Sequence, residues 1–182
     1  NYAVGRIVFT SAYEGTGFAA LSQTQTVSWN EHTSIATWLV GQYASPQTEY
    51  YGVRFNATGA FSGIGFYFFG SGNLTAKVYS WHEDYANTVN QEPVRSVNVS
   101  VMEGMQDILF EQLTAGEYLV VFTEMIYTGN GFGLYETAST DASLGTIAAN
   151  GYIKMYTDRA ENYANYAVGR IVFTSAYEGT GF

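Results

Sequence analysis

The three tryptophans are the side chains best suited to binding a sugar in this sequence. Trp29, Trp38 and Trp81 carry flat aromatic faces of the kind that stack on pyranose rings. Trp81 ends an alternating, strand-like segment beside a polar loop, so it is the strongest glycan-contact candidate. The alternative for all three is core packing, because aromatic side chains supply the largest buried areas of a β-sheet protein. We expect core or edge packing for Trp38 in particular.

Acidic residues in the segment 82–93 could offer oxygen ligands to calcium. Glu83 and Asp84 are the metal candidates, with Asn87 and Asn90 nearby in the sequence. Calcium takes about six to eight oxygens, and the spacing does not follow a known calcium-binding loop. We therefore expect a solvated acidic loop, with a structural calcium ion as the alternative and no other cofactor.

Catalytic chemistry has little support in the sequence. Hydrolysis of glycosides needs two carboxylates across a cleft, and neither spacing nor a motif pairs any two of the acidic residues in the middle of the chain. The histidines are isolated, and no nucleophile motif is present. These residues are Glu103, Asp107, Glu111, Glu117, Glu124, His32 and His82. We predict that the protein is not an enzyme and has no catalytic residue.

Three Asn-X-Ser/Thr triplets are candidate glycosylation sites. They begin at Asn56, Asn73 and Asn98. Asn56 and Asn73 are predicted at turn edges, which favours modification. Asn98 is predicted inside a strand, with its side chain on the polar face.

Composition restricts the class of protein. The chain has 16 acidic and 7 basic residues, a net charge of −9, so we expect neither nucleic acid nor a membrane as a partner. Aromatic residues make up 17% of the chain, which is typical of antiparallel sheets. Cysteine is absent, which favours a prokaryotic protein over a small secreted eukaryotic domain. No apolar run is long enough to span a membrane as a helix.

About ten short strands, and no helix of useful length, are predicted from alternation and turn signals. A slip in the alternation near Arg95 indicates a bulge. The predicted strands cover residues 3–10, 23–29, 34–40, 50–55, 63–69, 73–81, 94–101, 107–112, 118–123, 131–135 and 152–156. This spacing predicts an all-β fold of antiparallel strands, a β-sandwich or jelly roll.

The sequence repeats itself at its two ends. The eighteen residues NYAVGRIVFTSAYEGTGF fill positions 1–18 and again 165–182, so residue 165 begins a new copy of the unit that residue 1 began. We predict one jelly-roll unit over residues 1–164, with 165–182 as the start of the next unit. A domain has room for this strand once, so the second copy should lie in the following unit's sheet. The inter-unit strand residues are then Val4, Arg6, Val8, Val168, Arg170 and Val172.

Four origins of the repeat are compatible with the sequence. The chain could be one frame of a tandem array, or part of a filament that runs into its next unit; we favour these two together. An added strand that completes the fold and a cloning artefact are the alternatives. The junction TDRAENYANYA is short and contains no flexible linker, so neighbouring units should be held closely.

The segment 50–156 resembles a β-jelly-roll, carbohydrate-binding-like repeat domain of bacterial surface and glycan-degrading proteins. The resemblance lies in the order of VRFNATGAFSGIGFYF, GNLTAKVYSW, EDYANTVNQEPV, LTAGEYLVVFT, GFGLYE and NGYIKMY. It implies an accessory or structural module with a carbohydrate-binding-like fold, and it contains no catalytic signature.

Together these features predict an extracellular, non-catalytic structural repeat of the cell surface. It would form a fibre, stalk or adhesin by domain concatenation or strand exchange, with copies of itself as partners. The alternative function is a carbohydrate-binding module of a glycan-active or adhesive surface protein, with glycans as partners.

Overall fold

The computed structural model describes residues 21–24, 35–44, 48–137, 152–156, 159–163 and 166–175. Within these residues, eleven strands form one hydrogen-bonded network in which every pairing is antiparallel. The strands are β1 (Leu21–Thr24), β2 (Ile35–Gly41), β3 (Thr48–Ala57), β4 (Phe61–Ser80), β5 (Arg95–Val101), β6 (Gly104–Leu113), β7 (Gly116–Thr137), β8 (Tyr152–Tyr156), β9 (Arg159–Tyr163), β10 (Tyr166–Ala167) and β11 (Gly169–Ser175). The prediction of an all-β, antiparallel fold is confirmed.

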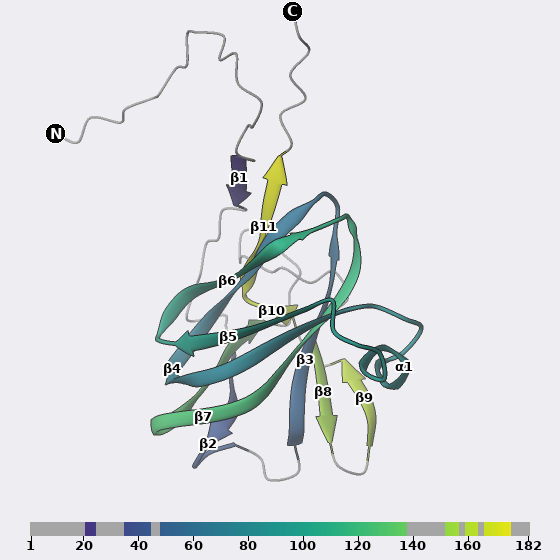
Figure 1. Cartoon of the computed structure of the whole chain (residues 1–182). Coiled ribbons are helices and arrows are strands. Elements are labelled where there is room, and N and C mark those ends of the chain that lie inside the picture. Colours follow the sequence, from purple (N-terminus) through teal and green to yellow (C-terminus); the bar gives the residue numbers. More distant parts are fainter. Residues whose placement is uncertain are drawn as a thin grey trace, which may run out of the picture.

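Two long strands, β4 and β7, connect the parts of this network (Figure 1). The sequence predicted two short strands in place of each, because glycines and polar residues interrupt the apolar runs. The structure continues both strands through these interruptions. The register of β4 against β7 shifts between Gly70 and Ser71, where Gly70 has a φ of +73° that favours glycine. The interruptions are therefore bends within strands.

Each half of β4 has its own pair of neighbours. The first half, from Phe61, pairs with β6 on one edge and β11 on the other. The second half, to Ser80, pairs with β5 and β7. β7 in turn pairs with β3 near its start and with β2 near its end. The two long strands thus connect most of the sheet, while β1, β8 and β9 join it through β11 and β3.

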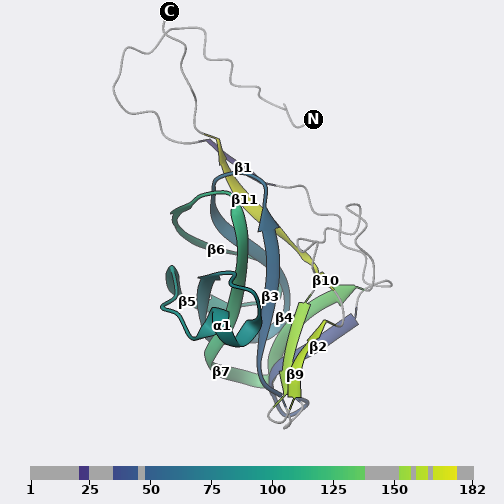
Figure 2. The ribbon, with the colours of Figure 1, turned by 90° about the vertical axis from the view of Figure 1, so that its right-hand side faces the viewer.

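The network curls so that its parts face one another across an aromatic core. The rings of Phe61 and Tyr118 have centroids 5.1 Å apart, and those of Phe66 and Phe122 are 5.3 Å apart. Neither pair consists of hydrogen-bonded strand partners, so these contacts join opposing faces. Figure 2 shows this curvature from the side. All four side chains are buried, and burial of such aromatic area is the largest stabilising contribution in a β protein.

The predicted loop 82–93 contains a short helix, α1 (Tyr85–Val89). Asp84 caps it: its side chain accepts a hydrogen bond from the backbone N–H of Asn87 at 2.8 Å. The predicted bulge near Arg95 is wrong, because β5 pairs with β4 without a shift of register from Arg95 to Val101. No helix in the described part of the chain has the length and apolar character needed to cross a membrane.

The second copy of the repeat joins the sheet of this same chain. We expected it in the sheet of a following unit, but its residues form β10 and β11, and β11 pairs with β4. The physical reason is that the first half of β4 has an edge that β7 leaves open. The alternating apolar residues of β11 fit this edge, with Ile171 buried in the core. The predicted strand at residues 3–10 lies outside the described residues. Residues 166–175 of the second copy therefore pair with strands of the same chain.

Candidate functional site

The strand β11 lies along the edge of β4 that β7 leaves open. We call residues 61–67 of β4, on this side, the acceptor edge. β7 pairs with β4 from Phe68 onward, and β11 pairs with Phe61–Phe66. Val168 joins the two regions: its N–H donates to the carbonyl of Tyr135 at 2.9 Å, and its carbonyl accepts from the N–H of Tyr67 at 2.9 Å. The second copy therefore continues the hydrogen-bonding pattern of β7 along β4.

One face of β11 belongs to the main core. Ile171 lies opposite Ile64 and has only 4% of its surface exposed, while Ala167 has 1% exposed. Phe173 lies opposite Phe61 and packs against the same core. Burying an isoleucine side chain contributes about 1.5–3 kcal/mol. The second copy thus contributes both backbone hydrogen bonds and core side chains to a sheet formed by the preceding residues.

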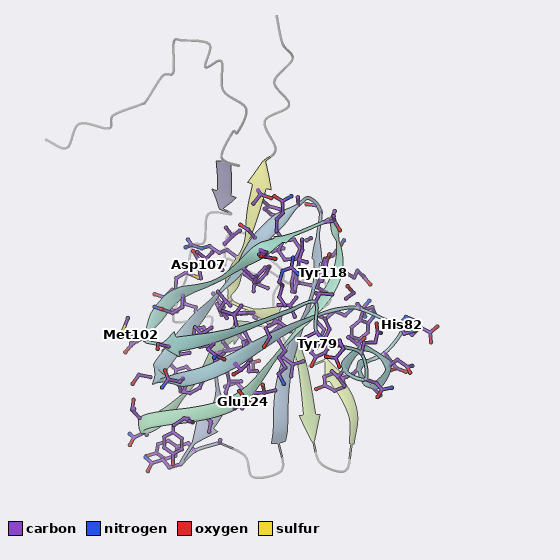
Figure 3. The ribbon with its side chains drawn as sticks, in the orientation of Figure 1. Tyr79, His82, Met102, Asp107, Tyr118 and Glu124 are labelled. Carbon is purple, nitrogen blue, oxygen red and sulfur yellow. The ribbon has the colours of Figure 1, made fainter. Side chains whose placement is uncertain are left out.

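The other face of β11 carries an ion pair that spans β4. Gly65 is the register partner of Arg170 on β11 and of Asp107 on β6. Arg170 donates to Asp107 from Nε at 2.8 Å and from Nη2 at 2.6 Å. Figure 3 shows Asp107 on the face of the sheet near β11. This bidentate geometry is the strong form of a carboxylate–guanidinium contact.

The ion pair is partly shielded from solvent. The side chain of Arg170 is 28% exposed and that of Asp107 is 24% exposed. Hydrogen bonding to Asp107 raises the pKa of the Arg170 guanidinium above its ordinary value, against the opposing effect of partial burial. The Arg170 guanidinium therefore stays protonated at physiological pH. Partial burial means that salt screens the pair less than a fully exposed pair.

Glycines on β4 allow the side chains of its two neighbours to meet. A Cβ atom at Gly65 would collide with Oδ1 of Asp107 and lie 3.0 Å from Cγ of Arg170. Gly63, two residues earlier on the same face, would place a Cβ 2.8 Å from Leu109 and 3.4 Å from Val172. Side chains on β11 and β6 therefore make contact over β4, which a strand with larger residues would prevent.

The free side of β11 is covered at its end by β1. Leu21 pairs with Ser175 and Thr24 pairs with Val172. Figure 1 shows β1 and β11 side by side at one end of the molecule.

Three of the predicted inter-unit residues lie in the first copy of the repeat and three lie in the second. Val4, Arg6 and Val8 lie outside the described residues. Val168 and Val172 are buried, and Arg170 makes the ion pair. The sequence reasoning missed Asp107 as the partner of Arg170. The available signal was a single carboxylate at the start of the apolar segment DILF, although nothing local indicates which cation it meets.

The tryptophans that the structure describes both contact other side chains. Trp38 packs edge-on against Phe69, with ring centroids 4.8 Å apart, and lies 5.1 Å from the ring of Tyr43. The guanidinium of Arg54 lies over the ring of Trp81, 4.1 Å from its centroid. Trp29 lies outside the described residues. A sugar that stacked on this face of Trp81 would first have to displace Arg54.

The predicted metal residues lie at the start of α1. Asp84 is engaged as the helix cap, and its second oxygen accepts from the Nδ2 of Asn87 at 3.0 Å. Glu83 is exposed, with a φ of +58°. Among the described residues, no group of three or more His, Cys, Asp or Glu side chains could hold a metal ion. His82 is exposed beside this helix, as Figure 3 shows. Calcium binding here stays a prediction.

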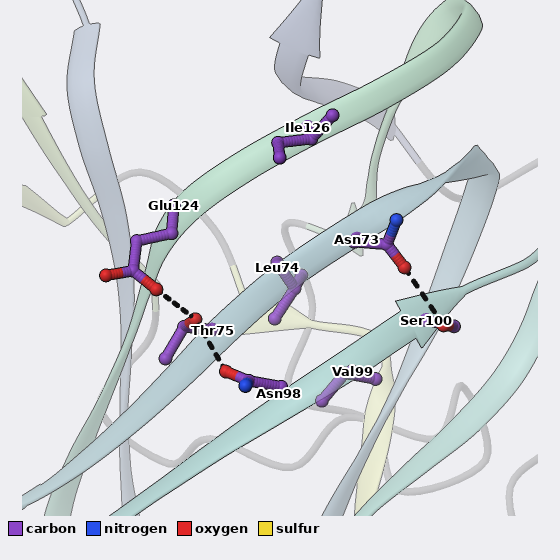
Figure 4. Close-up of a pocket in the computed structure, with 8 residues that line it drawn as sticks. All are labelled: Asn73, Leu74, Thr75, Asn98, Val99, Ser100, Glu124 and Ile126. Atoms are coloured by element: carbon purple, nitrogen blue, oxygen red, sulfur yellow. Dashed lines mark hydrogen bonds between the residues drawn. The ribbon is translucent and has the colours of Figure 1, made fainter.

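The glycosylation candidates Asn73 and Asn98 lie on the paired strands β4 and β5, so that each asparagine is opposite the Ser or Thr of the other triplet. Asn73 pairs with Ser100 and accepts a hydrogen bond from its hydroxyl at 2.9 Å, while the side-chain oxygens of Thr75 and Asn98 lie 2.9 Å apart. These residues line a shallow groove across β4, β5 and β7 (Figure 4). The expected turn-edge position of Asn73 is wrong, because it lies inside the continuous strand β4. Asn56 is exposed near the end of β3.

The central carboxylates are distributed over several separate contacts. Asp107 pairs with Arg170 and Glu117 pairs with Arg54 at 3.0 Å. Glu124 accepts a hydrogen bond from Thr75 at 2.6 Å in the groove of Figure 4, at a φ of +51°. Glu111 lies 3.8 Å from an arginine, and Glu103 is exposed. The contacts described for these groups are with cations and polar side chains of the sheet.

Comparisons with known proteins give no relative from which a role could be transferred. No protein-family model matches the chain, and neither the curated proteins nor the solved structures contain a match. The functional argument therefore rests on the repeat and on the geometry of β11.

Proposed function

We propose that this protein is a non-catalytic repeat unit of an extracellular surface fibre, stalk or adhesin, whose units are joined by a shared terminal strand. The observation that carries the proposal is the position of the second copy. In this chain β11 lies on the acceptor edge of β4, with Ile171 buried in the core; on the proposal, β11 is the strand that opens the next unit. Strand addition of this kind joins protein units through main-chain hydrogen bonds.

The number of strands and edges explains why assembly would continue. The chain carries two identical copies of the strand, at residues 1–18 and 165–182. The described sheet has one acceptor edge, and the second copy fills it. The first copy has every side chain required for the same position. In a tandem array, the second copy is itself the strand that opens the next unit. In a filament of separate chains, the first copy of one chain would replace the second copy of its neighbour at this edge.

The remaining features of the proposal fit this arrangement. A jelly roll or sandwich would follow from the curled sheet, whose facing parts are joined by the rings of Phe61, Phe66, Tyr118 and Phe122. The net charge of −9 would keep neighbouring fibres apart. The shared strand would make the same contacts whether the units are linked within one chain or exchange strands between chains.

Cysteine cross-linking tests the exchange of strands between chains. The natural chain contains no cysteine, so introduced pairs report without background. Thr174 donates its N–H to the carbonyl of Ala60 at 2.8 Å, and Thr10 is the residue equivalent to Thr174 in the first copy. One protein would carry Thr10→Cys, and the other would carry Ala60→Cys and end at residue 164, so that its own second copy does not fill the acceptor edge. Directly opposed residues on antiparallel strands are about 5 Å apart, which a disulfide can span.

We expect mixed dimers of these two proteins under oxidising conditions. The matched control replaces Thr10→Cys by Tyr13→Cys, which lies in the same copy beyond the equivalent of the described strand. Equal cross-linking of the two donors, or none from Thr10→Cys, would contradict the exchange of strands between chains.

Electron microscopy of the native material provides the second measurement. Regular filaments with an axial repeat close to the length of one domain are expected. Dispersed particles that bind immobilised glycans would favour the competing function, a carbohydrate-binding module, and a glycan array would then identify the sugar.

A further inference from the structure

We propose that the ion pair between Arg170 and Asp107, meeting over Gly65, sets the register of the shared strand and selects which strand the acceptor edge accepts. The inference rests on the proposed function, because Arg6 takes the place of Arg170 when the first copy of another unit is donated. It adds a specificity-determining contact to that joint.

Slips by an odd number of residues are excluded by burial. The side chains of a strand alternate between its two faces, so a slip of one residue exchanges the faces. Arg170 would then lie opposite Ile64 or Phe66, both with 0% of their surface exposed. An unpaired guanidinium in such a position is strongly unfavourable. The apolar core therefore rejects these registers without help from the ion pair.

Slips by two residues are not excluded in this way. They keep the alternation of β11, so small and apolar residues of the strand would still face the core. Arg170 would then lie opposite Gly63 or Tyr67 on β4. The residues that pair with those two positions on β6 are Leu109 and Met105. Of these registers, only the observed one places a carboxylate on β6 across from the guanidinium. The ion pair therefore favours this register over the two slipped ones, which bury similar apolar residues.

The local geometry supports this role. The two hydrogen bonds, at 2.8 and 2.6 Å, need both groups in one plane above Gly65, where a Cβ would collide with Asp107. A second polar contact agrees with the same register: the hydroxyl of Thr174 donates to Oε1 of Gln112 at 2.9 Å. Both contacts reach across β4 to β6. A donated strand therefore makes specific polar contacts with β6 at two positions, those of Arg170 and Thr174.

The test uses the full chain and two reporter pairs of cysteines. Ala60→Cys with Thr174→Cys reports the observed register. Ala60→Cys with Ala176→Cys reports a strand that has moved by two residues. Each pair is introduced with the natural charges, with Asp107→Arg, with Arg170→Asp, and with both reversals together. Peptide mapping by mass spectrometry then gives the yield of each disulfide, and circular dichroism reports whether each variant has folded.

With natural charges we expect the Ala60–Thr174 disulfide to dominate. Asp107→Arg places two cations together, and the yield of that disulfide relative to the Ala60–Ala176 disulfide should fall about tenfold or more, which corresponds to about 1.4 kcal/mol. Arg170→Asp should act in the same direction. The double reversal should restore the original ratio, because it rebuilds an opposite pair at the same place. If either single variant fails to fold, restoration of the fold by the double reversal supports the proposal equally.

The outcomes separate the two proposals. If the natural protein gives no Ala60–Thr174 disulfide, the shared strand is not on the acceptor edge and the proposed function loses its basis. If the natural protein gives the disulfide but Asp107→Arg leaves the ratio unchanged, only the register inference is overturned. Failure of the double reversal to restore the ratio also overturns it, because the single variants would then act through something other than their mutual charge.

Discussion

Arg170 and Asp107 are joined by two hydrogen bonds across the intervening strand β4, although 63 residues separate them in the sequence. Gly65 makes this possible, because it is the register partner of both residues and has no side chain between them. The contact is a charged link between the repeated segment and strand β6 of the same sheet. Interactions of this kind, unlike general apolar burial, distinguish one arrangement of a strand from another.

The identical copies provide a matched pair of core substitutions. Ile171→Ala removes a side chain that is 4% exposed in the main core, and we expect it to lower the free energy of unfolding by about 3 kcal/mol. Ile7→Ala makes the same change in the same local sequence of the first copy and should leave the stability of the isolated chain near that of the natural protein. Urea denaturation measures both. Equal losses would mean that the two copies share the acceptor edge.

A methyl group at Gly65 should weaken the joint. Gly65→Ala forces the new Cβ against Asp107 and to within 3.0 Å of Arg170, so we expect a loss of about 2 kcal/mol. Gly59→Ala is the control, because a Cβ there has its nearest contact at an ordinary 3.7 Å, from Phe173. Thermal unfolding compares the two variants. A neutral Gly65→Ala would show that the strands move apart without cost.

The cap of α1 should contribute measurably to the region around it. Asp84→Ala removes the acceptor for the N–H of Asn87, and caps of this kind are worth about 1 kcal/mol. Asp84→Ser keeps an acceptor oxygen and should retain most of the stability. Hydrogen exchange at residues 85–91 measures the effect locally. The same experiment with added calcium tests the metal prediction, since an ion bound by Asp84 and Glu83 would slow exchange there in the natural protein but not in Asp84→Ala.

Alkaline pH should destabilise the fold through Tyr79. Burial raises the pKa of Tyr79 above its ordinary value of 10.0, and the nearby charge of Glu92 raises it further. The folded state therefore holds this proton more tightly than the unfolded state. Its contribution to stability is complete below pH 10.0 and is lost as the pH rises from there through the raised pKa.

Tyr79→Phe tests this pH dependence. The variant should show a smaller loss of unfolding free energy between pH 9 and 11 than the natural protein, measured by chemical denaturation at each pH. Tyr43→Phe, at a position that is 61% exposed, is the control for the tyrosines in general. Identical slopes in the two variants would contradict the assignment to Tyr79.

The sequence by itself determined the class of fold and the presence of a repeated segment. Alternation of apolar side chains is a local property, so it predicted the strand at Tyr152–Tyr156 with its observed bounds. Residues 73–80 of the predicted strand 73–81 likewise lie within β4, where Leu74, Ala76 and Val78 are all buried. It divided β4 and β7 into shorter strands, because a glycine such as Gly70 has the same local appearance in a turn and in a bend.

The tertiary structure alone decided which sheet the second copy joins and what lies beside it. Pairing and register depend on residues far apart in the chain: Ile171 meets Ile64, and Arg170 meets Asp107. Alternation specifies which face of a strand is buried, but it is unchanged by a slip of two residues and contains no information about the partner strand. The joint of the proposed fibre therefore became visible only when the strands were placed in space.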